Sequence, residues 1–122
     1  MFYYHIHDPA LPRIDPSSLF YSILNVMWIF RWVLCDAELT TARKYCGAAV
    51  HNGRIYVVGG RDKSNNYLNT VEWLDGGSWR LSEPMNKKRN GVSLVECGGV
   101  LFAIGGYSGS SGENSFEILK EV

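Results

Sequence analysis

From residue 46 onward, short apolar runs alternate with turn-forming residues at a regular spacing. The run CGAAVHNG leads to Asn52-Gly53, RIYVVGG follows it, YLNTVEWLD ends before two further glycines, and SWRLSE comes after them. Runs of this length, bounded by Asn-Gly or Gly-Gly, predict short antiparallel strands joined by tight turns. Because RIYVVGG is nearly all apolar, that strand is expected to be buried on both faces. No amphipathic helical pattern separates the runs.

The pattern occurs twice in the sequence. GRIYVVGG at 53–60 returns as GVLFAIGG at 99–106, an offset of 46 that also places Arg43 on Arg89. After the glycines the offset is 45, so that NTVEWL matches NSFEIL. Two copies in one frame indicate a repeated structural unit. Four strands in about 46 residues, with no helix between them, predict one blade of a β-propeller or a comparable sheet repeat.

Each copy has a strand that ends in a pair of glycines, Gly59-Gly60 and Gly105-Gly106. Glycine has no Cβ, so it adopts positive φ without strain and lets another backbone approach closely. A single pair of this kind is weak evidence. Its repetition at matching positions predicts that both pairs end their strands in a crowded place near a propeller axis.

The glycine pairs belong to a longer motif that resembles the kelch repeat. That motif has a strand ending in a glycine pair, then an aromatic residue, then a tryptophan, and here the tryptophan is Trp79. The aromatic candidates are Tyr67 and Trp73, and the second copy is similar to repeats of the kelch-like family. The resemblance covers residues 39–122 and implies an all-β fold. It implies a partial kelch-type β-propeller of about two four-stranded antiparallel blades with an atypical hydrophobic N-terminal segment.

The expected domain boundaries follow this frame: repeat 1 spans 47–90 and repeat 2 spans 91–122. Repeat 2 is incomplete because no counterpart of Trp79 is present before Val122. Residues 32–46 are interpreted as the last strand of a preceding blade and a connecting loop, since Trp32 precedes Arg43 much as Trp79 precedes Arg89.

Fewer than two and a half blades cannot close a ring, and open blades expose strand edges and apolar faces. The interpretation is a fragment, a truncated isoform or part of an unusual gene model. The chain is expected to be marginally stable or an oligomer. Further kelch repeats or self-association would cover its open edges.

Residues 1–31 are left as an atypical hydrophobic leader. The run at 16–30 has no charge, but it is shorter than a membrane span and contains Pro16 and Asn25. The segment before it lacks the basic cluster of a signal peptide. A buried helix or strand pair and a leader on a truncated domain both remain open. His5 and His7 are weak evidence for a metal site without a third ligand.

Charge and cysteine content narrow the partners and the compartment. Twelve basic and 12 acidic residues balance, which argues against nucleic acid or an anionic membrane as the main partner. Cys35, Cys46 and Cys97 have no C-x-x-C spacing and are predicted to be reduced thiols in the core of a cytoplasmic protein.

Candidate chemistry is sparse. The sequence contains no G-x-S-x-G, H-E-x-x-H or phosphate-binding loop motif, and neither a catalytic residue, a cofactor nor a metal site is predicted. GGYSGSSG at 105–112 lacks a lysine and a following helix, so it is interpreted as a surface loop. His51 lies beside the first hairpin turn without a nucleophile and is interpreted as structural. The chain is therefore predicted not to be an enzyme.

Binding of a protein is the stronger hypothesis. In kelch-like propellers one face is made by loops that enter the inner strand and loops that follow the glycine pair. Arginines hold carboxylates in bidentate fashion, so an acidic peptide segment is a sensible ligand. For Arg43 and Arg89 the alternative is that they pair with neighbouring carboxylates or cap strand ends. The candidate partner-binding residues are Arg43, Lys44, Tyr45, Arg61, Asp62, Asn66, Arg89, Asn90, Tyr107 and Ser108.

By resemblance, the chain is the substrate-recognition part of a kelch-like adaptor for a cullin-type ubiquitin ligase, without the BTB and BACK domains that recruit the ligase. Binding to actin or the cytoskeleton is an alternative with the same origin. From a different class, a membrane-anchored or secreted protein that uses residues 16–30 also stays open.

Overall fold

The computed structural model describes residues 32–119. The chain divides into two units, Met1–Leu34 and Cys35–Val122, and the features described below belong to the second. The leader at 1–31, with His5, His7 and the apolar run at 16–30, lies outside the described residues, as do residues 120–122 of repeat 2.

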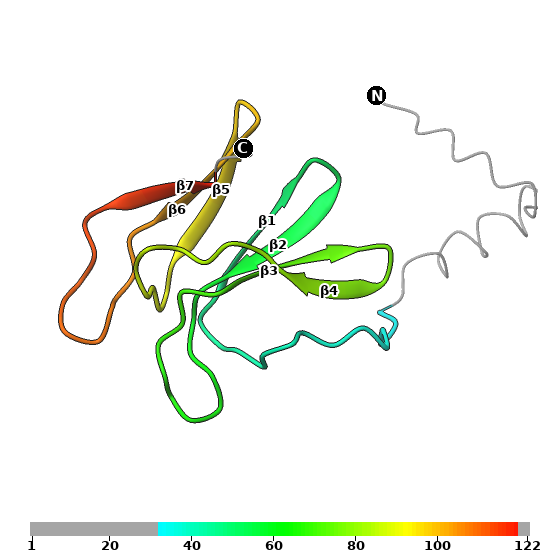
Figure 1. The fold of residues 1–122 in the computed structure, drawn as a ribbon, viewed down its shortest axis with the longest axis horizontal. Coiled ribbons are helices and arrows are strands. Elements are labelled where there is room, and N and C mark those ends of the chain that lie inside the picture. Colours follow the sequence, from blue (N-terminus) through cyan, green and yellow to red (C-terminus); the bar gives the residue numbers. More distant parts are fainter. Residues whose placement is uncertain (1–31, 120–122) are drawn as a thin grey trace, which may run out of the picture. The chain divides into compact units, whose positions relative to one another are not determined.

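The second unit contains two antiparallel sheets and, within residues 32–119, no helix, so the all-β prediction is confirmed (Figure 1). The first sheet has the order β1-β2-β3-β4 and the second has the order β5-β6-β7. The strands are β1 (Gly47–His51), β2 (Arg54–Val58), β3 (Val71–Asp75), β4 (Ser78–Leu81), β5 (Ser93–Cys97), β6 (Val100–Ile104) and β7 (Phe116–Leu119).

Tight hairpins join the strands at one end of each sheet. Asn52 and Gly53 have φ angles of 48° and 71°, which identifies the predicted Asn-Gly turn between β1 and β2. Gly98 and Gly99, between β5 and β6, repeat it with φ angles of 59° and 79°. Two residues with positive φ match the right-handed twist of the flanking strands, so these turns fix the register of both hairpins.

The third strand is shorter than the sequence predicts. It begins at Val71 rather than Tyr67, because the Gly59-Gly60 pair ends β2 after Val58. Tyr67 instead forms an isolated bridge with Arg61. Burial of β2 on both faces is confirmed for Tyr56, Val57 and Val58 but not for Ile55, which shares the side of Val57 and is 43% exposed near the hairpin.

The core lies between the two sheets. Tyr56, Val58 and Val71 from the first sheet pack with Leu101 and Ala103 from the second. Two residues of the segment that links the sheets, Met85 and Val92, complete the cluster. Each sheet therefore buries one apolar face against the other, and β1 and β5 are the strands in closest contact.

The three cysteines are reduced thiols, but the prediction that they lie in the core is wrong, because Cys35, Cys46 and Cys97 are all exposed. Cys97 ends β5 on the side of the sheet that turns away from β1–β4, where no packed layer covers it. His51 is only 6% exposed, and its ring contacts Tyr56 edge-on with centroids 6.0 Å apart, as expected of a structural histidine. Within residues 32–119, no helix is long and apolar enough to span a membrane.

Candidate functional site

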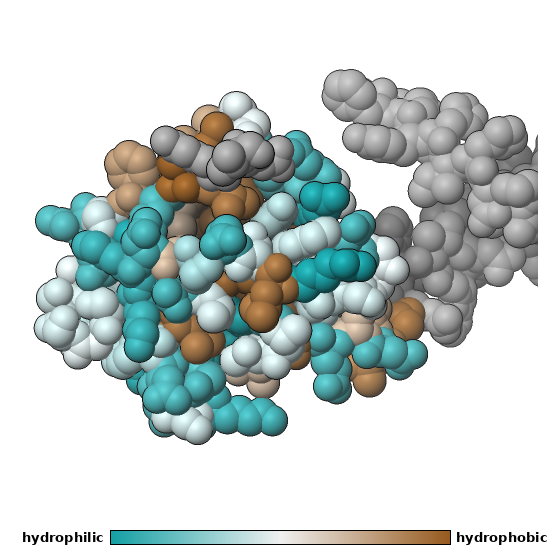
Figure 2. All heavy atoms as spheres, in the orientation of Figure 1, coloured by the Kyte–Doolittle hydropathy of each residue, from teal (hydrophilic) through white to brown (hydrophobic). Residues whose placement is uncertain are grey.

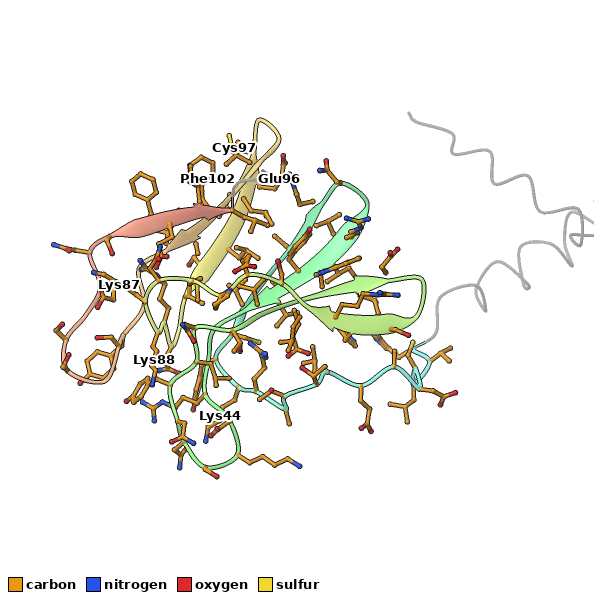
Figure 3. The ribbon with its side chains drawn as sticks, viewed as in Figure 1. Lys44, Lys87, Lys88, Glu96, Cys97 and Phe102 are labelled. Carbon is orange, nitrogen blue, oxygen red and sulfur yellow. The ribbon has the colours of Figure 1, made fainter. Side chains whose placement is uncertain are left out.

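Four segments meet at the end of the sheets opposite the hairpins, and we call this the loop end. It is made by residues 40–46, 59–70, 82–92 and 105–115, at the lower end of Figure 1. Figure 3 shows Lys44 and Lys88 at this end, whereas Glu96 and Cys97 lie at the hairpin end. The topology thus gathers the loops named in the sequence analysis at one end of both sheets.

The glycine pairs create the close approach on which the loop end depends. All four glycines have positive φ, between 62° and 96°. A Cβ on Gly59 would collide with the carbonyl oxygen of Arg89, and one on Gly60 with that of Lys44. In the second sheet a Cβ on Gly106 would lie 3.1 Å from the carbonyl oxygen of Asn90. Gly59, Gly60 and Gly106 therefore lie in crowded places, whereas at Gly105 only the positive φ favours glycine.

After each glycine pair the chain forms a short row of backbone bridges. Arg61 exchanges two hydrogen bonds with Lys44, at 2.8 and 2.9 Å, and Tyr107 exchanges two with Asn90, both at 2.9 Å. The two rows are the same structure shifted by one repeat. Their members are Lys44, Arg61 and Tyr67 in the first sheet and Asn90, Tyr107 and Gly112 in the second.

Arg43 lies beneath the first row, and its side chain has no exposed area. Its Nη1 donates to the carbonyl oxygens of Gly59 at 3.0 Å and Thr70 at 3.1 Å, and its Nη2 pairs with the Glu72 carboxylate. The backbone N–H and hydroxyl of Thr40 donate to the same carboxylate, each at 2.6 Å. We call this arrangement the first clamp.

Arg89 makes the second clamp with equivalent partners. Its Nη1 donates to the carbonyl oxygens of Gly105 at 2.7 Å and Ser115 at 3.0 Å, and its guanidinium pairs with Glu117 at 3.1 Å. The backbone N–H of Asn86 donates to Glu117 at 2.6 Å. Arg89 has no exposed area. For Arg43 and Arg89 the geometry favours the structural alternative, because their donors are used inside the sheets and no surface remains for a partner.

The clamps perturb their carboxylates. Burial alone would raise the pKa of Glu72, but hydrogen bonds from Thr40 and Arg43 outweigh it and hold the pKa below its ordinary value of 4.5. Burial likewise opposes ionisation of Glu117, and hydrogen bonds from Asn86 and Arg89 lower its pKa from 4.5. Both carboxylates are therefore ionised in the folded protein at neutral pH.

Above the first clamp lies a shallow hollow of about 220 Å³, the basic hollow. Its lining includes Lys44, Arg61 and Lys63, and Asp62 is the only acidic residue among the lining residues. The Asp62 carboxylate already accepts hydrogen bonds from Ser64 and Asn66 at 2.9 Å, and those from Asn66 lower its pKa. Asp62 therefore stays ionised, but it is one negative charge against the three positive charges of Lys44, Arg61 and Lys63, so the lining carries net positive charge.

Arg61 is held in place but has a donor left over. Its Nη2 donates to the Tyr67 hydroxyl at 2.6 Å, and its guanidinium lies over the Tyr67 ring, 4.4 Å from the centroid. Its Nε is buried and has no hydrogen-bond partner among the described residues. A buried donor without an acceptor is costly to the folded state.

The second row is polar and aromatic rather than basic. The Tyr107 ring is 39% exposed and contacts Tyr67 edge-on with centroids 5.8 Å apart, which joins the two rows. Ser108 bonds within its own loop, to Ser111 and Ser110. The Asn90 side-chain oxygen is buried without a partner in the described part of the chain.

Most of the remaining predicted residues lie at the loop end. Tyr45 is 63% exposed beside Lys44, whereas Asp62 and Asn66 bond to one another and shape the loop. Sequence reasoning did not select Lys63 or Tyr67 as contact residues. Tyr67 had a usable signal, because the offset of 45 places it on Gly112 in the equivalent row.

The described residues do not contain a group of three or more His, Cys, Asp or Glu side chains that could hold a metal ion.

Comparison with known proteins accounts for the repeated architecture. The sequence model of the Kelch motif matches residues 42–86 and 88–120. Kelch-like protein 41b of Danio rerio is 36% identical over 118 residues, covering 85% of this chain and 19% of that protein. Beta-scruin of Limulus polyphemus is 37% identical over 82 residues, covering 64% of this chain and 9% of that protein. Kelch-like protein 40 of Mus musculus is 36% identical over 73 residues, covering 59% of this chain and 12% of that protein.

The chain thus spans less than a fifth of the length of these relatives. The two family matches coincide with the two sheets, which are therefore blades of a partial kelch propeller, β1–β4 as blade 1 and β5–β7 as blade 2. Because these matches cover more than half of the residues, the chain belongs to the kelch motif family.

Proposed function

We propose that this chain is a non-enzymatic protein-interaction module whose loop end binds an acidic segment of a partner protein. The observation that supports this most strongly is the basic hollow, where Lys44, Arg61 and Lys63 outnumber the single carboxylate of Asp62. A carboxylate in the hollow would pair with these cations and neutralise the local charge. The exposed rings of Tyr45 and Tyr107 offer apolar contact on either side.

Two partner classes fit a kelch module. The first is the substrate of a cullin-type ubiquitin ligase, with this chain as the recognition part of the adaptor, acting in the cytoplasm. The second is actin or another cytoskeletal protein. An acidic peptide ligand suits the first class most directly, because a short charged segment fits a hollow of about 220 Å³.

Fluorescence anisotropy with a labelled glutamate-rich peptide tests the site. The full chain should bind this peptide, bind a lysine-rich peptide of equal length much more weakly, and lose affinity as salt rises. Lys63→Glu should weaken binding about fivefold, as expected for reversal of one exposed charge. Arg61→Met should weaken it more, because it also removes the buried donor.

Arg80→Glu is the matched control, since Arg80 is exposed on β4 outside the residues that line the basic hollow. It should leave the affinity unchanged. Equal binding of both peptides, or equal loss in the Arg80 variant, would contradict the proposed site. Affinity purification that returns ligase subunits or their substrates would support the adaptor, whereas co-sedimentation with actin filaments would support the alternative.

A further inference from the structure

The two blades expose opposite faces, and each exposed face has a buried counterpart in the other blade. On blade 2, Val95, Ile104, Phe116 and Ile118 are between 40% and 63% exposed. Together with Phe102 they lie on one side of the β5-β6-β7 register, and we call this side the open face. Figure 2 shows hydrophobic side chains gathered over these strands, and Figure 3 places Phe102 there.

The open face is the repeat-related copy of the blade 1 face that packs in the core. The offsets of 46 and 45 place Phe102 on Tyr56, Ile104 on Val58 and Phe116 on Val71. Those three residues of blade 1 are only 3% to 4% exposed, because blade 2 covers them. Among the described residues, the same positions of the same fold are therefore buried in blade 1, which blade 2 covers, and exposed in blade 2.

Blade 1 has the complementary surface, which we call the outer face. Val50, Ile55 and Leu81 are 60%, 43% and 62% exposed on the side opposite the core. Ile55 is the repeat-related counterpart of Leu101, which is 2% exposed in the core. The outer face of blade 1 is thus the repeat-related counterpart of the face that blade 2 packs against blade 1.

The segment that precedes blade 1 binds the outer face in the same way as the segment between the blades binds blade 2. Thr40 and Arg43 bind Glu72 on this face as Asn86 and Arg89 bind Glu117 on the corresponding face of blade 2. The open face has no charged residue in its strand registers, and the one carboxylate of the outer face, Glu72, is paired and buried. Contact between the two faces would therefore bury no charge that lacks a counter-charge.

We propose that the open face of one copy binds the outer face of a second copy, and so repeats between chains the blade contact that exists within each chain. Such an interface is heterologous, because the two faces differ and each copy uses both. Propellers typically contain 4–8 blades, so about two to four copies would close a ring. The partner is this same chain, and the loop end remains free.

Multi-angle light scattering of the full chain after size exclusion tests this proposal. The mass should be a multiple of 13.7 kDa, with about two to four copies in a closed ring. Val50→Glu on the outer face and Phe116→Glu on the open face should each give a monomer. Ser110→Glu, in an exposed loop, is the control and should keep the wild-type mass.

Mixing the two variants gives the sharpest result. Each retains one intact face, so Val50→Glu and Phe116→Glu together should form a dimer of one copy of each and grow no further. Circular dichroism checks that both variants keep their sheets, and Ile55→Glu or Ile118→Glu replaces a variant that unfolds. A monomeric wild-type chain, unchanged masses in both variants, or a mixture that stays monomeric would overturn the proposal.

Discussion

Blade 1 and blade 2 share one sequence pattern but lie in different surroundings. Comparing them shows which structural features the repeat determines and which depend on a neighbouring blade. The clamps, glycine pairs and bridge rows are present in both blades with equivalent partners. Burial is not equivalent, because Val58 is 3% exposed and its counterpart Ile104 is 46% exposed. Local backbone geometry therefore follows from the repeat, whereas burial of a blade face depends on the presence of the next blade.

The largest expected effect comes from breaking a clamp. Arg43→Met leaves Glu72 buried without its counter-charge and should destabilise the chain by about 3–5 kcal/mol in urea denaturation. Arg89→Met should cost less, because Glu117 is 16% exposed whereas Glu72 has no exposed area. Lys88→Met, next to Arg89 but exposed, should change the free energy of unfolding by less than about 0.5 kcal/mol. Equal stability of all three variants would show that the clamps do not hold the blades.

Replacing the first glycine of the pair should also destabilise the chain more in blade 1 than in blade 2. Gly105→Ala should cost about 1–2 kcal/mol, the strain of a side chain at positive φ, since the nearest atom to its Cβ is 3.6 Å away. Gly59→Ala adds a collision with the Arg89 carbonyl and should cost about 1–3 kcal/mol more. Thermal unfolding of both variants checks the order. A larger loss for the Gly105 variant would contradict the close approach at Gly59.

Acid should loosen both blades. The folded-state pKa values of Glu72 and Glu117 lie below 4.5, so their clamps contribute full stability above that pH and lose it as pH falls through the lowered values. Urea midpoints measured between pH 7 and pH 3 should decline most steeply below pH 4.5. Glu72→Gln and Glu117→Gln should each flatten this decline. A decline that both variants retain in full would assign the acid sensitivity to other groups.

The smallest expected effect concerns a contact that only blade 1 has. The Arg54 guanidinium lies 4.3 Å from the Trp73 ring centroid, whereas the counterparts in blade 2 are Val100 and Ile118. Arg54→Met should cost about 0.5–1 kcal/mol, the value of an exposed cation–π contact. Val100→Met is the matched change in blade 2 and should cost less. Chemical denaturation of the pair resolves the difference, and identical losses would mean that the ring contact contributes nothing.

The sequence predicted the features that depend on backbone geometry. Asn52-Gly53 specified a hairpin and Gly59-Gly60 a strand end, because few other residues adopt those φ angles. The constant offset then transferred both features to the second copy. Arg43 and Arg89 could not be assigned from sequence, since their role depends on carboxylates about 28 residues away that only the folded sheet brings close. The exposure of Cys97 could not be predicted for a related reason, because which face of a blade is covered is a property of the assembled sheets.

Hydrogen exchange measured by mass spectrometry is the most direct test of the statement that residues 47–81 and 93–119 are two copies of one folded blade. Amides of β1, β2 and β3 should exchange slowly, and those of β5 and β6 should repeat the same pattern 46 residues later. Amides on the outer edge of β7 should exchange fast, because β3 has β4 as a further neighbour, whereas among the described strands β7 pairs only with β6. Protection confined to residues 47–81, with free exchange across 93–104, would contradict the two-blade structure.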